Sequence, residues 1–398
     1  MNLNKNDNLG FWSSASLVVG NMIGSGIFLL PASLALYGLV SILGWLFASI
    51  GAILLAIVFG ELSKIYNKEP GGPYKFTRNV FGDFPGFLVA WGYWISIWST
   101  NTAIVVAFLG YLSVFIPSLN TYPLYSIIIG LFTIWTLTWI NSKEIKTIGF
   151  VQKITVVLKV IPIILVGIIG IFFIDLNNFY SLEIGNEFNF NSITVTTTLT
   201  FFAFLGMESA TIPSDKINKP NSIIKKATLY GTIFTIIIYI LSSISIMGII
   251  PPTTLAQSSA PFADAAEVIA GDYSRKVIAL GAIIATIGAL NGWILIQGQI
   301  PMAASKDKLF PKFFSKTNNN KSPVFGIILS SLLISILLLF SYSKTLVEAF
   351  TFMIKLSTLS VITPYLFSTA SLAVLSKRKF NRLFISFLAF IFSIWIII

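Results

Sequence analysis

The chain has 398 residues, of which 55% are hydrophobic and only 10% are charged. With a mean hydropathy of +0.86, this composition exceeds what a soluble core can bury and predicts an all-α polytopic membrane protein. Cysteine and histidine are absent, which excludes disulfides, metal sites built from these residues and histidine acid–base chemistry. We therefore expect no metal and no cofactor. The missing phosphate-binding loop motif argues against an ATP-driven pump.

Runs of about 20 apolar residues predict eleven membrane spans. They lie near residues 11–35, 39–63, 84–116, 123–141, 148–174, 192–213, 224–249, 275–304, 323–341, 346–376 and 383–398. The last run covers only about 24 Å at the helical rise, less than the ~30 Å hydrocarbon core. We interpret it as a partial span in a domain truncated at its C-terminal end.

The basic residues predict the orientation of these spans. With the N-terminus in the cytoplasm, most of the 26 Lys and Arg residues fall in cytoplasmic segments, as the positive-inside rule requires. The formal net charge of +11 therefore reflects topology, and no nucleic-acid partner is expected. We predict a multi-pass protein of the cell inner membrane whose N-terminus is cytoplasmic.

Glycines interrupt the first span at membrane depth. Gly20, Gly24, Ser25 and Gly26 follow one another within 11–35. Backbone groups in hydrocarbon have to bond internally, so such a run indicates a helix that unwinds against a water-filled cavity. The alternative is that Gly20-x-x-x-Gly24 is an ordinary helix-packing motif.

The sixth span, 192–213, is interrupted in the same way at 205–208. Broken spans five apart predict a five-plus-five inverted-repeat transporter of the LeuT-like fold, with discontinuous helices 1 and 6. Amides freed after Gly24 suit a carboxylate, and carbonyls freed near 202–205 suit an ammonium, which predicts a site for a zwitterionic amino acid. We assign one transmembrane domain, 1–398, with a first repeat at 11–174, a second at 192–376 and the partial eleventh span at 383–398.

We place three charged residues deep within predicted spans. Glu208 is the only carboxylate that we place at membrane depth, and we interpret it as a proton carrier or gate. Its alternative is a solvated residue at the cytoplasmic mouth. Lys159 is interpreted as a fixed ammonium in place of a sodium ion, or else as a snorkelling side chain. Lys355 either pairs with Glu208 or faces a cavity, and the sequence does not choose between these.

Three aromatic residues stand beside polar or glycine interruptions. Asn101 follows Tyr93, Gly206 follows Phe202, and Asn291-Gly292 precedes Trp293. Such rings are suited to stack on a cationic group or to close over it. The alternative for each ring is an ordinary place in the core.

Several motifs are specific enough to indicate a family. They are GNMIGSGIFLLPASLA (20–35), EPGGPYKFTRNVFG (69–82), FLGMESA (204–210), IMGIIP (246–251), SAPFADAA (259–266), GALNGWILIQGQ (288–299) and TPYLF (363–367). With these motifs the chain closely resembles the amino acid–polyamine–organocation family, and within it the bacterial arginine/agmatine antiporters. The resemblance covers nearly the whole chain and implies twelve spans, so the last is missing here.

The resemblance also implies where a substrate binds. Asn21, Ser25 and Gly26 fall at the positions that hold its carboxylate and amino group. Asn101 and Ser357 fall where the family binds its distal group.

Gates and proton-sensitive positions are implied in the same way. Tyr93 and Glu208 resemble the outer gate and the proton-sensitive position of the antiporters, and Trp293 resembles their middle gate. Phe202 stands where those antiporters have a Trp that stacks on the guanidinium, so it is both a binding and a gating candidate. Lys159 and Lys355 replace small or apolar residues, and Lys159 is more typical of proton-coupled branches.

The sequence therefore predicts a secondary active amino acid transporter rather than an enzyme. The expected activity is antiport of a basic amino acid, arginine, against its decarboxylated amine, agmatine, or a related cation. The alternative within the family is an amino acid or polyamine permease that works by proton symport or facilitated uptake. A channel is a further alternative. The expected partners are the small-molecule substrate and the lipid bilayer, with a homodimer implied by family analogy alone.

Overall fold

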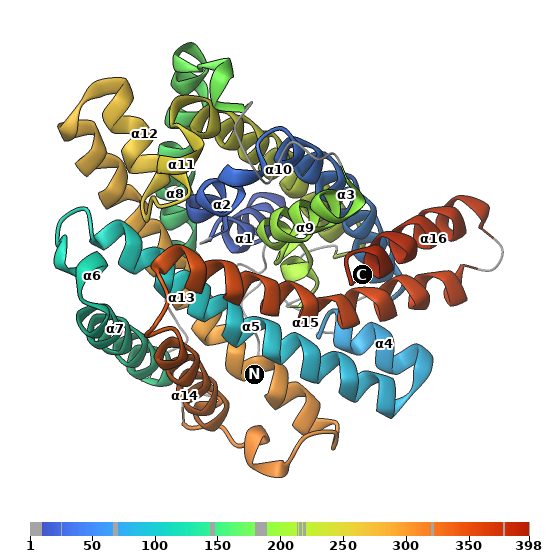
Figure 1. Cartoon of the computed structure of the whole chain (residues 1–398). Coiled ribbons are helices and arrows are strands. Elements are labelled where there is room, and N and C mark those ends of the chain that lie inside the picture. The colour runs from blue at the N-terminus through green and yellow to red at the C-terminus, as the bar shows by residue number, and fades with distance from the viewer. Residues whose placement is uncertain are drawn as a thin grey trace.

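The computed structural model describes residues 10–24, 26–66, 71–143, 148–179, 189–212, 214, 217, 220–319, 322–376 and 379–397. The elements in these ranges are α-helices and short 3-10 helices, which confirms the predicted all-α class. Figure 1 shows the helices packed into one bundle, with α5 and α15 side by side through its centre.

Nine segments of the described chain are long and apolar enough to cross a membrane. They contain α1 (Phe11–Met22) with α2 (Gly26–Leu34), α3 (Val40–Ile65), α5 (Asp83–Leu112), α7 (Pro123–Lys143), α8 (Ile148–Gly170), α9 (Phe190–Phe201), α10 (Pro220–Ile249), α13 (Asp272–Lys306) and α15 (Leu346–Leu375). Two shorter apolar helices, α14 (Val324–Phe340) and α16 (Phe380–Trp395), account for the other two of the eleven predicted spans. The connecting helices are α4 (Pro73–Phe81), α6 (Ser118–Thr121), α11 (Pro252–Leu255) and α12 (Pro261–Ala270).

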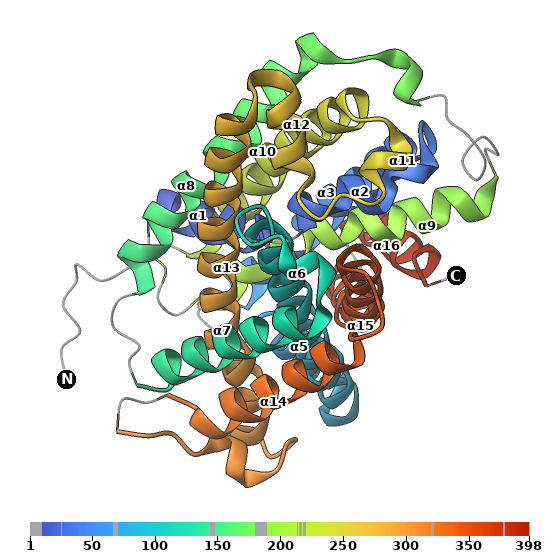
Figure 2. The ribbon, with the colours of Figure 1, turned by 60° about the vertical axis from the view of Figure 1, so that its left-hand side comes forward.

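Helix contacts repeat when each span is exchanged for the one five places along. α1 in the first span packs on α10 in the seventh. The exchange turns this pair into the sixth and second spans, and α9 and α3 of those spans also pack together. In the same way α5 packs on α15, and its counterpart α13 packs on α8. The pairing of α7 with α14, visible in Figure 2, is its own counterpart. Such exchange is expected of two halves that share one fold.

Two connecting helices repeat at residue level. Pro73 opens α4 and Pro261 opens α12, and each helix ends at a glycine with positive φ, at 89° for Gly82 and 81° for Gly271. An aspartate then begins the next helix in both cases. α4 packs on α5 and α15, whereas α12 packs on their counterparts α13 and α8. The shared Pro-to-Gly-Asp pattern, with nine residues in α4 and ten in α12, was visible in the sequence, and our sequence analysis missed it.

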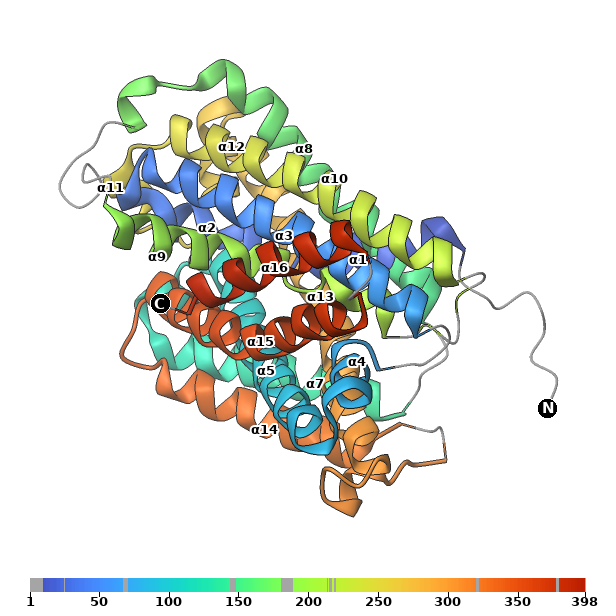
Figure 3. The same cartoon turned by 90° about the vertical axis from the view of Figure 1, so that its right-hand side faces the viewer.

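Glu61 is a second buried carboxylate, which our sequence analysis did not single out. It is buried near the end of α3, where Lys225 Nζ lies 2.6 Å and Lys64 Nζ 3.6 Å from its Oε1, and Arg382 Nη2 lies 2.5 Å from its Oε2. The cluster ties α16 to α3 and α10 at one end of the molecule, and Figure 3 shows these helices close together. Three cations around one carboxylate make this a structural ion-pair network on the predicted cytoplasmic side.

Asp307 makes a second network at this side, just beyond α13. Its Oδ2 accepts hydrogen bonds from Tyr74 Oη at 2.8 Å and Lys75 Nζ at 3.3 Å, and Arg78 Nη1 lies 2.9 Å away. Burial raises the pKa of Asp307, but these partners outweigh burial and hold it below its ordinary value. Stability from this network is therefore lost only as the pH falls through that low pKa. The network joining α4 to α13 thus stays ionised at neutral and mildly acidic pH.

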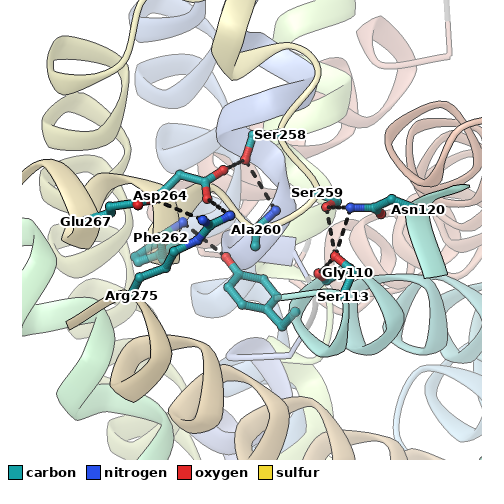
Figure 4. Close-up of polar contacts among 11 residues, drawn as sticks. Gly110, Ser113, Asn120, Ser258, Ser259, Ala260, Phe262, Asp264, Glu267 and Arg275 are labelled. Carbon is teal, nitrogen blue, oxygen red and sulfur yellow. Dashed lines mark hydrogen bonds and ion pairs between the residues drawn. The ribbon is translucent and has the colours of Figure 1, made fainter. Parts of the chain in front are cut away.

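Figure 4 shows a group of polar contacts around α12, away from these two networks. Arg275 bridges Asp264 and Glu267, each at 3.1 Å, and Ser258 donates to Asp264 at 2.5 Å. Burial raises the pKa of Asp264, against the opposing effects of Ser258 and Arg275.

Tyr111 connects this region to the first helix. Its hydroxyl donates to the Phe28 carbonyl of α2 at 2.8 Å and accepts from the Phe262 amide of α12 at 3.2 Å. One buried side chain of α5 therefore holds α2, the second half of the broken helix, against α12.

Candidate transport site

The first helix loses its hydrogen-bond ladder where the sequence predicted. The Ile23 amide still bonds the Val19 carbonyl at 2.8 Å, but the Gly24 amide bonds Met22 at 2.9 Å instead of reaching back to Gly20. α1 therefore ends at Met22, and α2 begins at Gly26. Ser25, a predicted site residue between them, lies outside the described residues.

Two side chains from other helices take up the carbonyls freed at this break. Lys159 of α8, only 1% exposed, donates from Nζ to the Gly20 carbonyl at 3.2 Å. Tyr239 of α10 donates to the Met22 carbonyl at 2.7 Å. Carbonyls at a helix C-terminus carry partial negative charge, so a fixed ammonium is favourable there. A side chain this buried does not snorkel, so the structure contradicts that alternative for Lys159. Its interpretation as a fixed ammonium in place of a sodium ion stays a prediction.

The second break comes in the sixth span. α9 ends at Phe201, η4 (Phe202–Phe204) adds one 3-10 turn, and Leu205 is extended with ψ at 137°. Gly206 follows in the left-handed region with φ at 99°, and η5 (Met207–Thr211) resumes helical structure. Only glycine adopts this φ without strain. Gly206, which indicated the interruption in the sequence, therefore also determines where the helix breaks.

The two breaks face one another. A Cβ built on Gly26 would lie 3.1 Å from Ala203 Cα, and one on Gly206 would lie 3.1 Å from Asn21 Cβ and 3.2 Å from Trp293 Cζ2. These are closer than ordinary carbon contacts, so the missing side chains are what lets the two backbones approach. Unwound peptide groups of both helices therefore share one region, flanked by α5 and α13.

Gly206→Ala should impair both stability and transport. The φ of Gly206 costs an L-residue about 1–2 kcal/mol, and the added methyl group would also press on Asn21 and Trp293. We expect a lower melting temperature and uptake reduced at least tenfold in proteoliposomes. Gly82→Ala is a stringent control for backbone strain, because Gly82 combines a φ of 89° with a ψ of −167°, which is almost exclusive to glycine, and has nothing within 4 Å. Equal losses in both variants would show that strain alone, and not closeness of the breaks, explains the defect.

Glu208 lies directly after the second break and is fully buried. Its Oε1 accepts a hydrogen bond from the hydroxyl of Tyr93 in α5, and its Oε2 accepts one from Tyr365 in α15 at 2.7 Å. Tyr93 and Glu208, predicted together, are thus brought into contact. Tyr365 was missed as a site residue, although it stands in the TPYLF motif. A carboxylate held by two hydroxyl groups links η5 to two neighbouring helices.

The candidates for the distal group of a substrate have separate partners. Asn101 Nδ2 donates to Gln297 Oε1 of α13 at 2.7 Å. Ser357 Oγ lies 2.6 Å from Thr100 Oγ1 and donates to the Ser96 carbonyl at 3.0 Å. All these groups are buried. Gln297 was not predicted, and only its place in the GALNGWILIQGQ motif pointed to it.

The aromatic candidates line the region where the breaks meet. Phe202 is 4% exposed, its Cδ1 lies 3.4 Å from the Cβ position of Gly26, and its ring packs edge-on against Phe350 with centroids 6.1 Å apart. Trp293 is equally buried and lies against Gly206.

Lys355 does not make the predicted pair with Glu208, and the alternative that it faces a cavity stays a prediction. Its side chain is exposed on α15, whereas the Glu208 oxygens are held by Tyr93 and Tyr365.

A bundle of apolar helices with two broken spans facing each other defines a polytopic membrane transporter. The amino acid permease family profile matches residues 9–398. A putrescine transporter of Haemophilus influenzae is 31% identical over 98% of this chain and 91% of its own length. An arginine/ornithine antiporter of Pseudomonas aeruginosa is 29% identical (96% and 84%), and a cadaverine/lysine antiporter of Escherichia coli K12 is 30% identical (92% and 83%).

The chain belongs to the amino acid–polyamine–organocation family, as its motifs indicated. It is a transporter of amino acids or amines and not an enzyme.

Proposed function

We propose that this protein is an antiporter that exchanges a basic amino acid, arginine, for its decarboxylated amine or a related cation across the inner membrane. The observation that carries the proposal is the approach of the two breaks, where Gly26 meets Ala203 and Gly206 meets Asn21 and Trp293. Half-helix ends of opposite charge in one region suit the two charges of an α-amino acid. The printed activities of the three relatives, all on basic amino acids or their amines, support the cationic substrate.

The predicted binding and gating residues then have the following roles. Backbone amides at Ser25 and Gly26 hold the carboxylate with Asn21, and carbonyls near Phe202 hold the amino group. Asn101 and Ser357 meet the distal cation. Tyr93 and Glu208 form the outer proton-sensitive gate, with Phe202 and Trp293 closing over the substrate.

Two repeats, 11–174 and 192–376, would rock against each other around this site. The exchange of helix contacts and the repeated Pro-to-Gly-Asp segments support these halves. The N-terminus is cytoplasmic in this proposal, because that orientation puts most basic residues on the cytoplasmic side. Subunits pair as homodimers by analogy with the family.

Phe202→Trp should tighten arginine binding by about twofold to fivefold, since indole is the better partner for a guanidinium and the gain is on the order of 0.5–1 kcal/mol. Binding of putrescine should change less, because a compact ammonium stacks less well on a ring. Competition against labelled substrate measures both. Phe350→Trp, which enlarges the neighbouring ring, is the control. An unchanged arginine affinity would place the Phe202 ring away from the bound side chain.

Counterflow in proteoliposomes tests the proposed activity. Vesicles preloaded with agmatine, ornithine or putrescine, or left empty, are supplied with labelled arginine. We expect rapid accumulation only in preloaded vesicles, independent of sodium. Equal uptake into empty vesicles that rises with an imposed proton gradient would instead favour the symporter, the alternative that a buried Lys159 beside the first break supports.

A further inference from the structure

Gln297 is held in a single orientation by its neighbours in α14. Its Nε2 donates to the Ile327 carbonyl at 3.0 Å and to Ser331 Oγ at 2.9 Å. A backbone carbonyl only accepts hydrogen bonds, so the nitrogen of this amide has to face Ile327. The remaining atom, Oε1, therefore faces α5.

This orientation fixes a second amide. Gln297 Oε1 only accepts, so Asn101 has to present its Nδ2 to it, and the two lie 2.7 Å apart. Asn101 then directs its own oxygen away from the pair. Asn101 is 0% exposed, and its Oδ1 accepts no hydrogen bond from any residue that the structure describes. Such a buried acceptor is costly unless a donor reaches it.

The Asn101–Gln297 pair lies next to the region where the breaks meet. Ile104, one helical turn from Asn101, lies 3.9 Å from the Cβ position of Gly24. Trp293, one turn from Gln297, touches Gly206. A donor held between the two breaks is therefore about one turn from the Asn101 oxygen.

We infer that Gln297 is a positioning residue that selects a cationic substrate, because it forces Asn101 to offer the site an acceptor rather than a donor. The inference rests on the proposed function and extends it to a residue that does not itself touch the substrate. An ammonium or guanidinium donates to that oxygen. An uncharged side chain that lacks donors leaves it unpaired.

The test compares cationic with uncharged ligands in the full chain. Affinities of L-arginine, L-ornithine and L-norvaline, which has the carbon chain of ornithine without its ammonium, are measured by competition against labelled substrate. Gln297→Met frees the Asn101 amide to turn, so the preference for ornithine over norvaline should fall about tenfold. Norvaline affinity itself should be unchanged, whereas a general packing defect would lower all three affinities together.

A conservative variant and a control complete the design. Gln297→Glu is neutral when buried, so its O–H donates to the Ile327 carbonyl while its other oxygen accepts from Asn101. This variant should retain the preference, which also covers the case in which Gln297→Met does not fold. In an Asn101→Leu background, Gln297→Met should have no further effect on the preference, because the positioned group is gone. Ser330→Ala is the control, since Ser330 contacts the backbone carbonyl of Gln297 and not its side chain.

The outcomes separate this inference from the proposed function. A wild-type protein that does not prefer arginine and ornithine over norvaline refutes the proposed function. A wild-type preference that survives in Gln297→Met, or that is lost in Gln297→Glu, overturns the role of Gln297 and leaves the transport proposal standing.

Discussion

Lys159→Met should reduce turnover by at least tenfold while leaving the protein folded in the membrane. Lys159 supplies the hydrogen bond to the Gly20 carbonyl at the end of α1, and a buried acceptor left unpaired costs about 1–3 kcal/mol. The unpaired carbonyl would destabilise the C-terminal end of α1, which has to keep its conformation through the transport cycle. Initial rates of counterflow in proteoliposomes, normalised to inserted protein, measure the effect.

The second intramembrane lysine is the matched control. Lys355→Met removes the same charge from a side chain that is exposed on α15, so transport should stay near the wild-type rate. Lys159→Ala, which also removes the side-chain volume, should either abolish turnover or make it respond to sodium. A Lys159→Met variant with the wild-type rate would contradict the role of a fixed ammonium.

Glu208→Gln should flatten the pH dependence of transport. As a carboxylate, Glu208 accepts from Tyr93 and Tyr365 at once. Protonation turns one oxygen into a donor, so one tyrosine must rotate its hydroxyl, and the tie between α5 and α15 weakens. Glutamine cannot titrate, and the rate should therefore become insensitive to mild acidification. Rates over a pH series in vesicles with equal internal and external pH measure this.

The control for Glu208 is Glu61, the other carboxylate that is buried in the described part of the chain. Glu61→Gln leaves Lys225, Lys64 and Arg382 without their anion, so it should lower the melting temperature by several degrees. The shape of its pH profile should follow the wild type. A Glu208→Gln variant with an unchanged profile would remove Glu208 from proton sensing.

The two helix breaks were predictable because a single glycine determines each of them. Gly24 and Gly206 break two helices, and both breaks are visible as glycines inside apolar runs. Their mutual contact was predictable only through the symmetry of spans one and six. Tyr93 and Glu208 followed from the family motifs together with burial.

What the sequence could not give are contacts between residues far apart in the chain. Tyr365 meets Glu208, and Gln297 meets Asn101, through packing of helices whose register no local pattern encodes. Glu61 was overlooked because it stands at the edge of an apolar run and its cations come from three separate segments. For Lys355 the sequence showed a charge within a span but did not reveal which way the side chain faces.

The most direct test uses the natural absence of cysteine from this chain. Ala289 lies 3.7 Å from the Cβ position of Gly24, so Ala289→Cys places one thiol beside the first break. N-ethylmaleimide should label it during turnover, and saturating arginine should slow that labelling at least fivefold, whereas norvaline should not. Ala279→Cys, on the same helix but away from the breaks, controls for changes in overall accessibility. The contrary result is that no basic amino acid or amine changes the labelling rate of Ala289→Cys. It would mean that no substrate binds between the two broken helices.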